Sequence, residues 1–242
     1  MSTNPASASH PCEFGICDGS GFVVDELTAT ATDCRCRPLR IAATRARALE
    51  ARIPKRYRAI SFDHSDVIDI ERRCPTQVRV VRSFAANIGA NLDAGNGLWL
   101  YGGLGTGKTA LAMIVSKAAI DAGRTVAIYS CPRLLAVMRE SIDRDGLLSF
   151  VDRLAAADLL HIDDLGAEHR TEWVLEQLYS LINARYEEER STIVTSNLGP
   201  IDQQLQEQLG DRVVSRLEQM CDPLAVYGPD QRRLPDAVAG PR

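Results

Sequence analysis

The chain lacks the hydrophobic segments that direct a protein into a membrane or out of the cell. No stretch approaches the roughly 18 consecutive apolar residues that span a bilayer as a helix. The first 15 residues, MSTNPASASHPCEFG, have no basic start followed by an apolar run, so they do not resemble a signal peptide. We therefore expect a cytoplasmic protein without membrane contacts.

The chain also lacks an excess of positive charge and any internal repeat at solenoid periods. Its 28 Lys and Arg residues oppose 32 Asp and Glu residues, a net charge of −4, so nucleic-acid binding would need a local basic patch. Hydrophobic residues make up 45% of the 242 positions and charged residues 25%. These values are typical of a globular chain with one core domain and an appendage.

One segment matches a phosphate-binding motif at every fixed position. Residues 102–109 read GGLGTGKT, which fits G-x-x-x-x-G-K-[ST]. Glycines let backbone N–H groups surround phosphate oxygens, and the following helix adds its positive N-terminal end. Lys108 would reach the β- and γ-phosphates, and the Thr109 hydroxyl would bind Mg²⁺. We predict an ATP site formed by Gly102, Gly103, Leu104, Gly105, Thr106, Gly107, Lys108 and Thr109.

Strand and helix patterns alternate from Thr76 onward, which predicts an α/β three-layer fold with a mostly parallel sheet. Helices are expected at 76–92, 108–122, 132–141 and 172–189. Strands are expected at 98–101, 125–129, 159–162 and 192–195, and a further one is indicated at 224–227. The phosphate-binding segment then lies between a strand and a helix, as the motif requires.

Polar side chains follow two of these strands. Asp163 and Asp164 come directly after strand 159–162, where one carboxylate can hold Mg²⁺ and the other can orient or deprotonate a water molecule. Asn197 ends the segment TIVTSN and could position water beside the γ-phosphate. Capping of a turn or helix is an equally natural role for Asn197, and both interpretations stay open.

Four of the seven cysteines crowd into the first 36 residues, in the spacing C-x4-C…C-x-C. These four are Cys12, Cys17, Cys34 and Cys36. Four thiolates can close a tetrahedral zinc site, and a module of this size would scarcely fold without metal. His10 could replace one ligand, and unpaired cysteines in an irregular tail are the alternative.

Residues 37–58 are strongly basic, with eight Lys and Arg residues against Glu50 alone. The stretch could contact DNA phosphates or an acidic partner, or it could be a solvated linker helix that ends at Pro54. The chain is therefore divided into a Cys-rich module (1–36), a basic helix and linker (37–75), an ATPase domain (76–233) and a tail (234–242).

Five segments, in this order, carry a resemblance to a known family: GGLGTGKT, LLHIDDLG, EWVLEQLYSLINARYEE, TIVTSN and GDRVVSRL. Over about residues 53–233 the chain resembles the AAA+ ATPases of the DnaC/DnaI type, which load the replicative DNA helicase. The IstB-like ATP-binding family shares this core. The resemblance implies a helicase loader, with an IstB-type helper of a transposase as the alternative. A small-molecule P-loop kinase fits the motif set less well.

The resemblance also implies roles for individual residues. Asp163 would be the Walker B magnesium ligand, and Asp164 the catalytic acid where many relatives have the longer Glu, so hydrolysis would be slow without partners. Asn197 would be the sensor 1 residue. Arg212 or Arg216 would be the arginine finger that acts on a neighbouring subunit, which implies self-association into a ring or spiral.

Further implications concern the ends of the chain. Only residues 217–242 follow Arg216, so the helical lid would be reduced or absent, and Arg232 or Arg233 could stand in for the sensor 2 arginine. The N-terminal module would grip the helicase. Residues 132–142 would face single-stranded DNA with Arg133 and Arg139, but they lack an aromatic platform, which predicts weak or conditional binding.

Overall fold

The structure, a computed structural model, describes residues 12, 14–25, 30–37, 53–142 and 146–231. The chain divides into two compact units, Met1–Ala48 and Leu49–Arg242. His10, Arg232, Arg233 and most of the basic stretch lie outside the described residues. The finer division of the chain into four parts stays a prediction.

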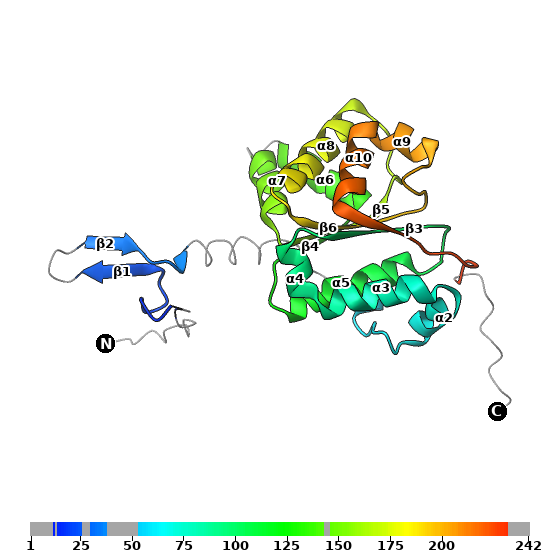
Figure 1. Ribbon diagram of the computed structural model, residues 1–242. Helices are drawn as coiled ribbons and strands as arrows, with labels where there is room; N and C mark the ends of the chain where they lie inside the picture. Colours follow the sequence, from blue (N-terminus) through cyan, green and yellow to red (C-terminus); the bar gives the residue numbers. More distant parts are fainter. Residues whose placement is uncertain (1–11, 13, 26–29, 38–52, 143–145, 232–242) are drawn as a thin grey trace. The chain divides into compact units, whose positions relative to one another are not determined.

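The larger unit contains a five-stranded parallel sheet in the order β4-β5-β6-β3-β7 (Figure 1). Its strands are β3 (Gly97–Tyr101), β4 (Val126–Ser130), β5 (Leu159–Leu165), β6 (Ser191–Ser196) and β7 (Cys221–Ala225). The predicted α/β fold with a parallel sheet is confirmed. Within the described residues no helix is long and apolar enough to cross a bilayer.

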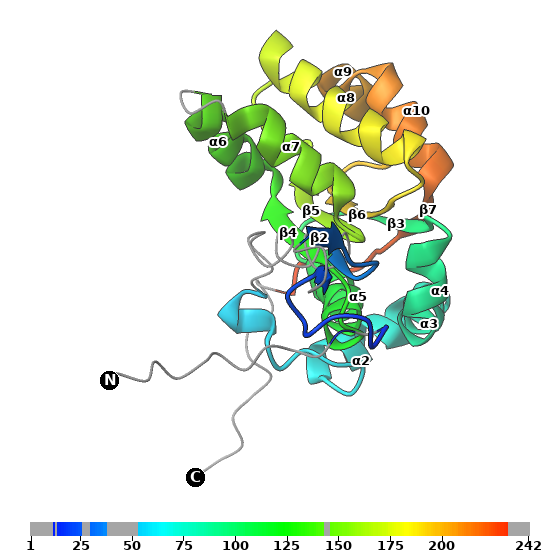
Figure 2. The same cartoon turned by 90° about the vertical axis from the view of Figure 1, so that its left-hand side faces the viewer.

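Helices cover both faces of the sheet, which gives three layers in each view (Figures 1 and 2). One face carries α2 (Ser65–Arg73), α3 (Pro75–Ala86), α4 (Ile88–Asp93) and α5 (Lys108–Asp121). The other carries α6 (Cys131–Ser141), α7 (Gly146–Ala156), α8 (Glu172–Glu187), α9 (Gln203–Leu209) and α10 (Asp211–Met220). After α10 the described chain contains only β7 and an irregular segment, so no helical lid is present there.

Almost every residue of β3, β4, β5 and β6 is buried, because helices cover both faces of the sheet. Along β3, Leu98 and Leu100 belong to the core cluster of the α2–α5 layer, and Trp99 belongs to the cluster of the α6–α10 layer. This alternation follows from the two-residue period of a strand. The same period decides which polar side chains face α5 at the ends of the strands.

Several predicted boundaries were wrong. The helix predicted at 76–92 is two helices, α3 and α4, separated at Asn87, whose side-chain amide donates to the Ser83 carbonyl at 2.9 Å. The linker contains α2, and α7 was not predicted at all. Strand β5 continues to Leu165, so Asp163 and Asp164 lie within its last residues and not after it.

A fully buried cation links helices of the α6–α10 layer to the sheet. The guanidinium of Arg185 in α8 donates to the carbonyl oxygens of Leu154 at 2.6 Å and Ala157 at 2.9 Å, and to that of Ser191. It also donates to the Thr192 hydroxyl at 3.0 Å. These acceptors offset the cost of burying the charge, and they fix the end of α7 against the start of β6.

The smaller unit contains a two-stranded antiparallel hairpin. β1 (Phe22–Asp25) pairs with β2 (Thr30–Asp33), and Val23 lies opposite Thr32. An isolated hairpin of this length is marginal in water. Its stability must therefore come from additional contacts, which the cysteines at its base can provide.

Candidate nucleotide site and metal centre

The loop Gly102–Thr109 joins the end of β3 to the start of α5. Gly107 has a φ of 105°, in the left-handed region, and a Cβ atom there would lie 2.2 Å from Cδ1 of Ile70 in α2. Only glycine meets both conditions. The backbone can thus turn sharply into α5 while α2 packs directly against the loop.

The ammonium group of Lys108 contacts the backbone of this loop. Its Nζ donates to the carbonyl oxygens of Gly102 and Gly103, both at 2.7 Å, and to Oδ1 of Asn197 at 3.1 Å. The side chain is buried although it is a lysine. The structure therefore brings together the predicted phosphate-binding lysine and the predicted sensor residue.

Thr109 and Asp163 meet across the interface between α5 and the sheet. Leu159 and His161 of β5 face α5, so the two-residue period places Asp163 on the same face. Oδ1 of Asp163 accepts from the Thr109 hydroxyl at 2.9 Å and from the Thr195 hydroxyl at 2.7 Å. A hydroxyl and a carboxylate oxygen so close together are the ligand types that Mg²⁺ prefers.

The electrostatics favour an ionised Asp163. Burial alone would raise the pKa of this carboxyl group, but His161 and the hydroxyls of Thr195 and Thr109 outweigh burial and lower its pKa below the ordinary value. Nε2 of His161 lies 3.9 Å from Oδ1 of Asp163, and its Nδ1 pairs with the Ser116 hydroxyl at 2.9 Å. The site thus carries the negative charge that a divalent cation needs.

The backbone conformation at Asp164 gives its side chain a different direction from that of Asp163. The pairing of β5 with β6 is irregular between Ile162 and Leu165, and Asp164 has a φ of 56°, which non-glycine residues rarely adopt. Its amide N–H donates to the Thr195 hydroxyl at 2.9 Å. The side chain lines the pocket beside the loop, so the two adjacent aspartates occupy distinct positions around it.

A pocket of about 280 Å³ opens over the loop. Of the predicted site residues, Leu104–Thr109, Asp164 and Asn197 line it, whereas Gly102, Gly103 and Asp163 are not among its lining residues. Sequence reasoning missed the remaining walls, which include Arg56, Tyr57, Asp66, Ile70 and Gln231. No motif distinguishes these residues, because they come from the linker and from the segment after β7 and reach the loop only through folding.

The two candidate finger arginines lie on α10, and neither is among the described residues that line this pocket. Arg216 donates from Nε to Oδ1 of Asn183 at 3.1 Å and lies 4.3 Å from the ring centre of Tyr186. Arg212 is exposed, with its guanidinium 5.9 Å from the ring centre of Tyr179. Neither therefore completes the site of its own chain.

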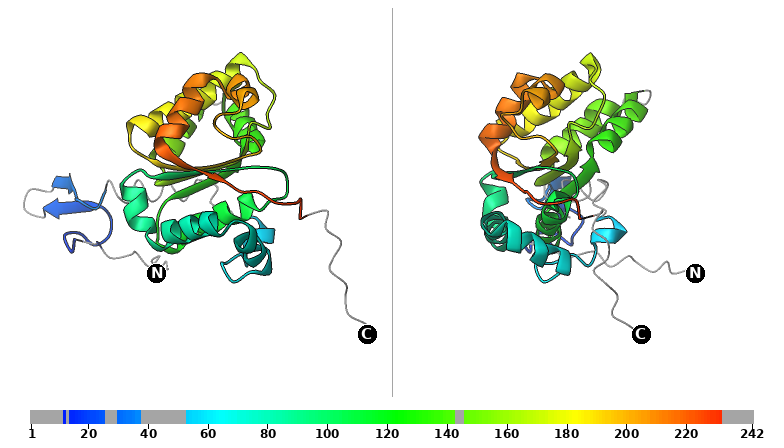
Figure 3. Two further views of the ribbon diagram at one scale, coloured as in Figure 1. Left: turned by 45° about the vertical axis from the view of Figure 1, so that its right-hand side comes forward. Right: turned by 90° about the vertical axis from the view of Figure 1, so that its right-hand side faces the viewer.

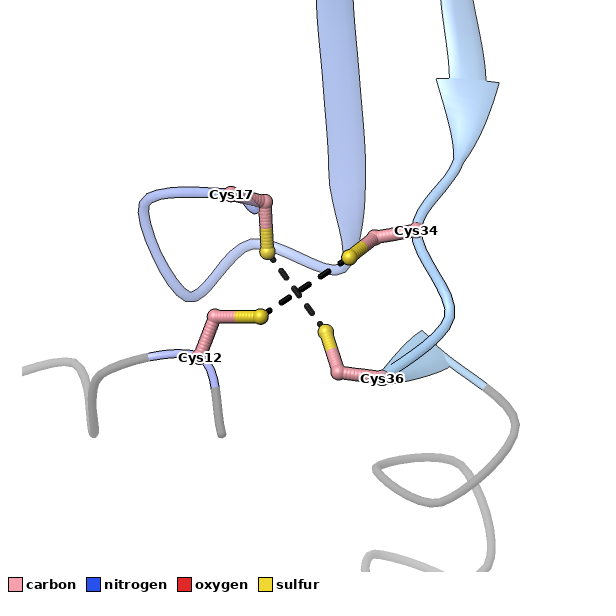
Figure 4. Close-up of side chains that lie close together, drawn as sticks. All are labelled: Cys12, Cys17, Cys34 and Cys36. Carbon is pink, nitrogen blue, oxygen red and sulfur yellow. Dashed lines mark hydrogen bonds between the residues drawn. The ribbon is translucent and has the colours of Figure 1, made fainter. Parts of the chain in front are cut away.

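The four N-terminal cysteines converge at the base of the hairpin, with all four sulfur atoms within 4.8 Å of one another (Figure 4). Cys12 and Cys34 are 3.8 Å apart, and Cys17 and Cys36 are 3.5 Å apart. A tetrahedron with Zn–S bonds of about 2.3 Å has edges of about 3.8 Å. The cluster therefore has the size and donor set of a four-cysteine zinc centre.

The thiol pKa values differ strongly within the cluster. Backbone N–H groups of Cys17 and Ile16 lower the pKa of Cys12 to about 6. Burial, together with the neighbouring sulfur atoms, raises the pKa of Cys36 to about 12. Four thiolates this close repel one another, so a bound cation would be needed to hold all four ionised.

The comparisons with known proteins agree with this geometry. Residues 41–235 match the family described as IstB-like ATP binding protein. The ATP-binding protein of insertion sequence IS21 from Pseudomonas aeruginosa is 30% identical over 170 residues, which cover 70% of this chain and 60% of that protein. The replicative helicase loader DnaI of Bacillus subtilis is 26% identical over 107 residues, or 44% of this chain and 34% of DnaI.

The same core occurs in a solved structure. The crystal structure of the DnaC helicase loader aligns with a TM-score of 0.60 and 26% identity, and the match covers 72% of this chain and all of that one. The larger unit therefore has an AAA+ P-loop fold. In contrast, this chain spans less than two thirds of the length of the IS21 protein and of DnaI.

Proposed function

This chain belongs to the IstB-like ATP-binding protein family, and from that membership we propose that it is an ATP-dependent loader of a replicative DNA helicase. Binding and hydrolysis of ATP would control its contacts with the helicase and with single-stranded DNA. The observation that carries the nucleotide chemistry is the contact of Thr109 and Thr195 with one oxygen of Asp163. The similarity to DnaC and DnaI supports the choice of partner.

Each part of the site would have one role in hydrolysis. The loop and Lys108 would hold the phosphates, while Thr109 and Asp163 would hold Mg²⁺, which neutralises phosphate charge. Asp164 would orient or deprotonate the attacking water, and Asn197 would position it beside the γ-phosphate. Because Asp164 is one methylene shorter than Glu, we expect slow turnover without partners.

A complete site would need a second copy of the chain. Arg216 is held by Asn183 and Tyr186 of its own chain, whereas Arg212 is exposed on α10. We therefore assign the trans-acting arginine to Arg212. This assignment predicts a ring or spiral in which Arg212 contacts the nucleotide of the neighbouring subunit.

The small unit would be the part that grips the helicase. The four-cysteine cluster lies at its base, and large apolar side chains are exposed on its surface, namely Phe14, Ile16 and Val24.

Contacts with DNA would be weaker than those with the helicase. On α6, Arg133 lies 3.8 Å from Glu140, and Arg139 lies over the ring of Trp173 at 4.9 Å, so both cations are partly engaged.

A second function has support of its own, because the IS21 protein matches a larger part of this chain than DnaI does. The chain would then assist a transposase in place of loading a helicase. Both functions use the same ATP site, so the site geometry does not separate them. The identity of the partner that the protein retains separates the two functions.

The test is retention of a partner by the full chain in a lysate of its own host, with and without ATP. We compare the wild type with Lys108→Ala, and with Lys117→Ala, a lysine two and a half turns further along α5. Retention of the replicative helicase by the wild type and Lys117→Ala, but not by Lys108→Ala, supports the loader. Retention of a transposase instead would overturn it, and unchanged ATP affinity in Lys108→Ala would overturn the nucleotide site.

A further inference from the structure

A short segment after β7, residues 226–231, runs past the carboxyl end of β3 on the side of α2 (Figure 3). We call this segment the C-terminal strap. The amide of Val226 donates to the Tyr101 carbonyl at 2.7 Å, and the amide of Gln231 donates to the Gly105 carbonyl at 3.2 Å. The strap is therefore bonded to β3 at one end and to the phosphate loop at the other.

The middle of the strap is bonded to the end of α2. The carbonyl oxygen of Tyr227 accepts from Nη1 of Arg73 at 3.1 Å and from Sγ of Cys74 at 3.3 Å. A Cβ atom at Gly228 would lie 1.7 Å from that same nitrogen of Arg73, so the strap and the end of α2 are in close contact. With contacts at both ends and in the middle, the strap has a defined course over the loop.

This course places Asp230 against the tip of the phosphate loop. Gly105 has a φ of 68°, and a Cβ atom there would lie 1.7 Å from Oδ1 and 2.9 Å from Cα of Asp230. The carboxylate thus packs directly on the loop backbone, and Asp230 is half-buried. Gln231, the next residue, lines the nucleotide pocket.

A carboxylate at this position opposes the charge of the nucleotide. A triphosphate carries one more negative charge than a diphosphate, and its repulsion from a fixed carboxylate is correspondingly larger. We propose that Asp230 is a specificity-determining residue, which weakens nucleotide binding in proportion to phosphate charge. The proposal rests on the ATP-binding function proposed above. Such repulsion would lower the affinity of the isolated chain for ATP more than for ADP.

Replacing Asp230 with asparagine tests the proposal directly. Asn keeps the size of the side chain and can still accept a hydrogen bond, and the bond between Gln231 and Gly105 uses only backbone atoms. We expect the Kd for ATP to fall about three- to tenfold, because the substitution removes one half-exposed carboxylate beside the phosphate loop. The Kd for ADP should fall less, and both changes should shrink in high salt.

The matched control is Asp222→Asn, an exposed carboxylate at the far end of the same β7 segment. It should leave both Kd values unchanged. Weaker binding of ATP and ADP by Asp230→Asn would overturn the proposal and make Asp230 a ligand, for example of a ribose hydroxyl. Equal affinities of the wild type and Asp230→Asn would also overturn it. If the wild type itself binds no ATP, the proposed function fails as well.

Discussion

Thr195 connects the two aspartates of the candidate site, and its replacement by valine should disturb both. Its hydroxyl donates to Oδ1 of Asp163 at 2.7 Å and accepts the amide N–H of Asp164 at 2.9 Å. Valine has nearly the same shape and keeps the buried contacts of this fully buried position. The substitution therefore removes the hydroxyl and little else.

The expected loss of stability follows from these two bonds. A hydrogen bond to a charged group contributes about 1.5–3 kcal/mol, and an amide left without its acceptor costs about 1–3 kcal/mol when buried. Asp164 is exposed, so water can reach part of this region. The cost of leaving its amide without an acceptor should therefore be near the lower value, about 1 kcal/mol. We expect Thr195→Val to lower the free energy of unfolding by about 2–4 kcal/mol near neutral pH.

The pH dependence separates the two contributions. The pKa of Asp163 is lowered in the folded protein, so its contribution is present above the unfolded pKa and is lost as pH falls through the folded pKa. Thr195→Val removes one contact that lowers this pKa. The difference between wild type and variant should therefore be largest near neutral pH. It should narrow as the pH falls below the ordinary aspartate pKa of about 3.9 and Asp163 becomes protonated in both proteins.

Urea unfolding without nucleotide or Mg²⁺ measures this difference at each pH. Thr195→Ser is the control, because it keeps the hydroxyl and should recover most of the lost stability. The same Thr195→Val protein should hydrolyse ATP more slowly, since Asp164 loses the contact that fixes its backbone. A pH-independent loss, or an equal loss in Thr195→Ser, would refute the role of the hydroxyl.

Two further predictions concern the assembly and the metal centre. Arg212→Ala should lower ATP turnover, measured as steady-state ATPase activity, by about a thousandfold or more, while ATP binding by the unassembled chain is unchanged. Mixing it with Lys108→Ala subunits should restore turnover. A mixture no more active than its components would contradict a trans-acting Arg212. Metal analysis should find about one zinc ion per chain. The zinc should be lost in Cys36→Ser but kept in Cys131→Ala, because Cys131 lies buried in the larger unit. Equal zinc content in both variants would contradict the four-cysteine site.

The parts of the site that could be predicted are those governed by local chemistry. The glycine spacing of the loop follows from what a phosphate requires of the backbone, whatever surrounds it. The facing of Asp163 toward α5 follows from the two-residue period that starts at Leu159. The sequence pattern did not reveal that β5 continues through Asp164, because a positive φ at a non-glycine residue leaves no signature in the sequence.

The parts that could not be predicted depend on residues distant in sequence. Ile70 packs on Gly107, and Asp230 packs on Gly105, across gaps of 37 and 125 positions in the chain. Neither contact leaves a periodic pattern, since each involves one side chain and one glycine. Arg185 was missed for a similar reason: a single arginine in an amphipathic helix is typical of an exposed face, whereas this one is fully buried.

The polar groups of the site are hydrogen-bonded to one another within the chain. Lys108 is bonded to two loop carbonyls and to Asn197, and Asp163 accepts from two hydroxyls. A nucleotide must exchange these bonds for new ones, so its net gain from this chain is smaller than the number of new contacts suggests. The arginine of a neighbouring subunit would replace no such bonds within the pocket, since α10 contributes none of its described lining residues. Assembly is therefore the step at which ATP binding would gain most, which is the behaviour expected of a switch that responds to its partners.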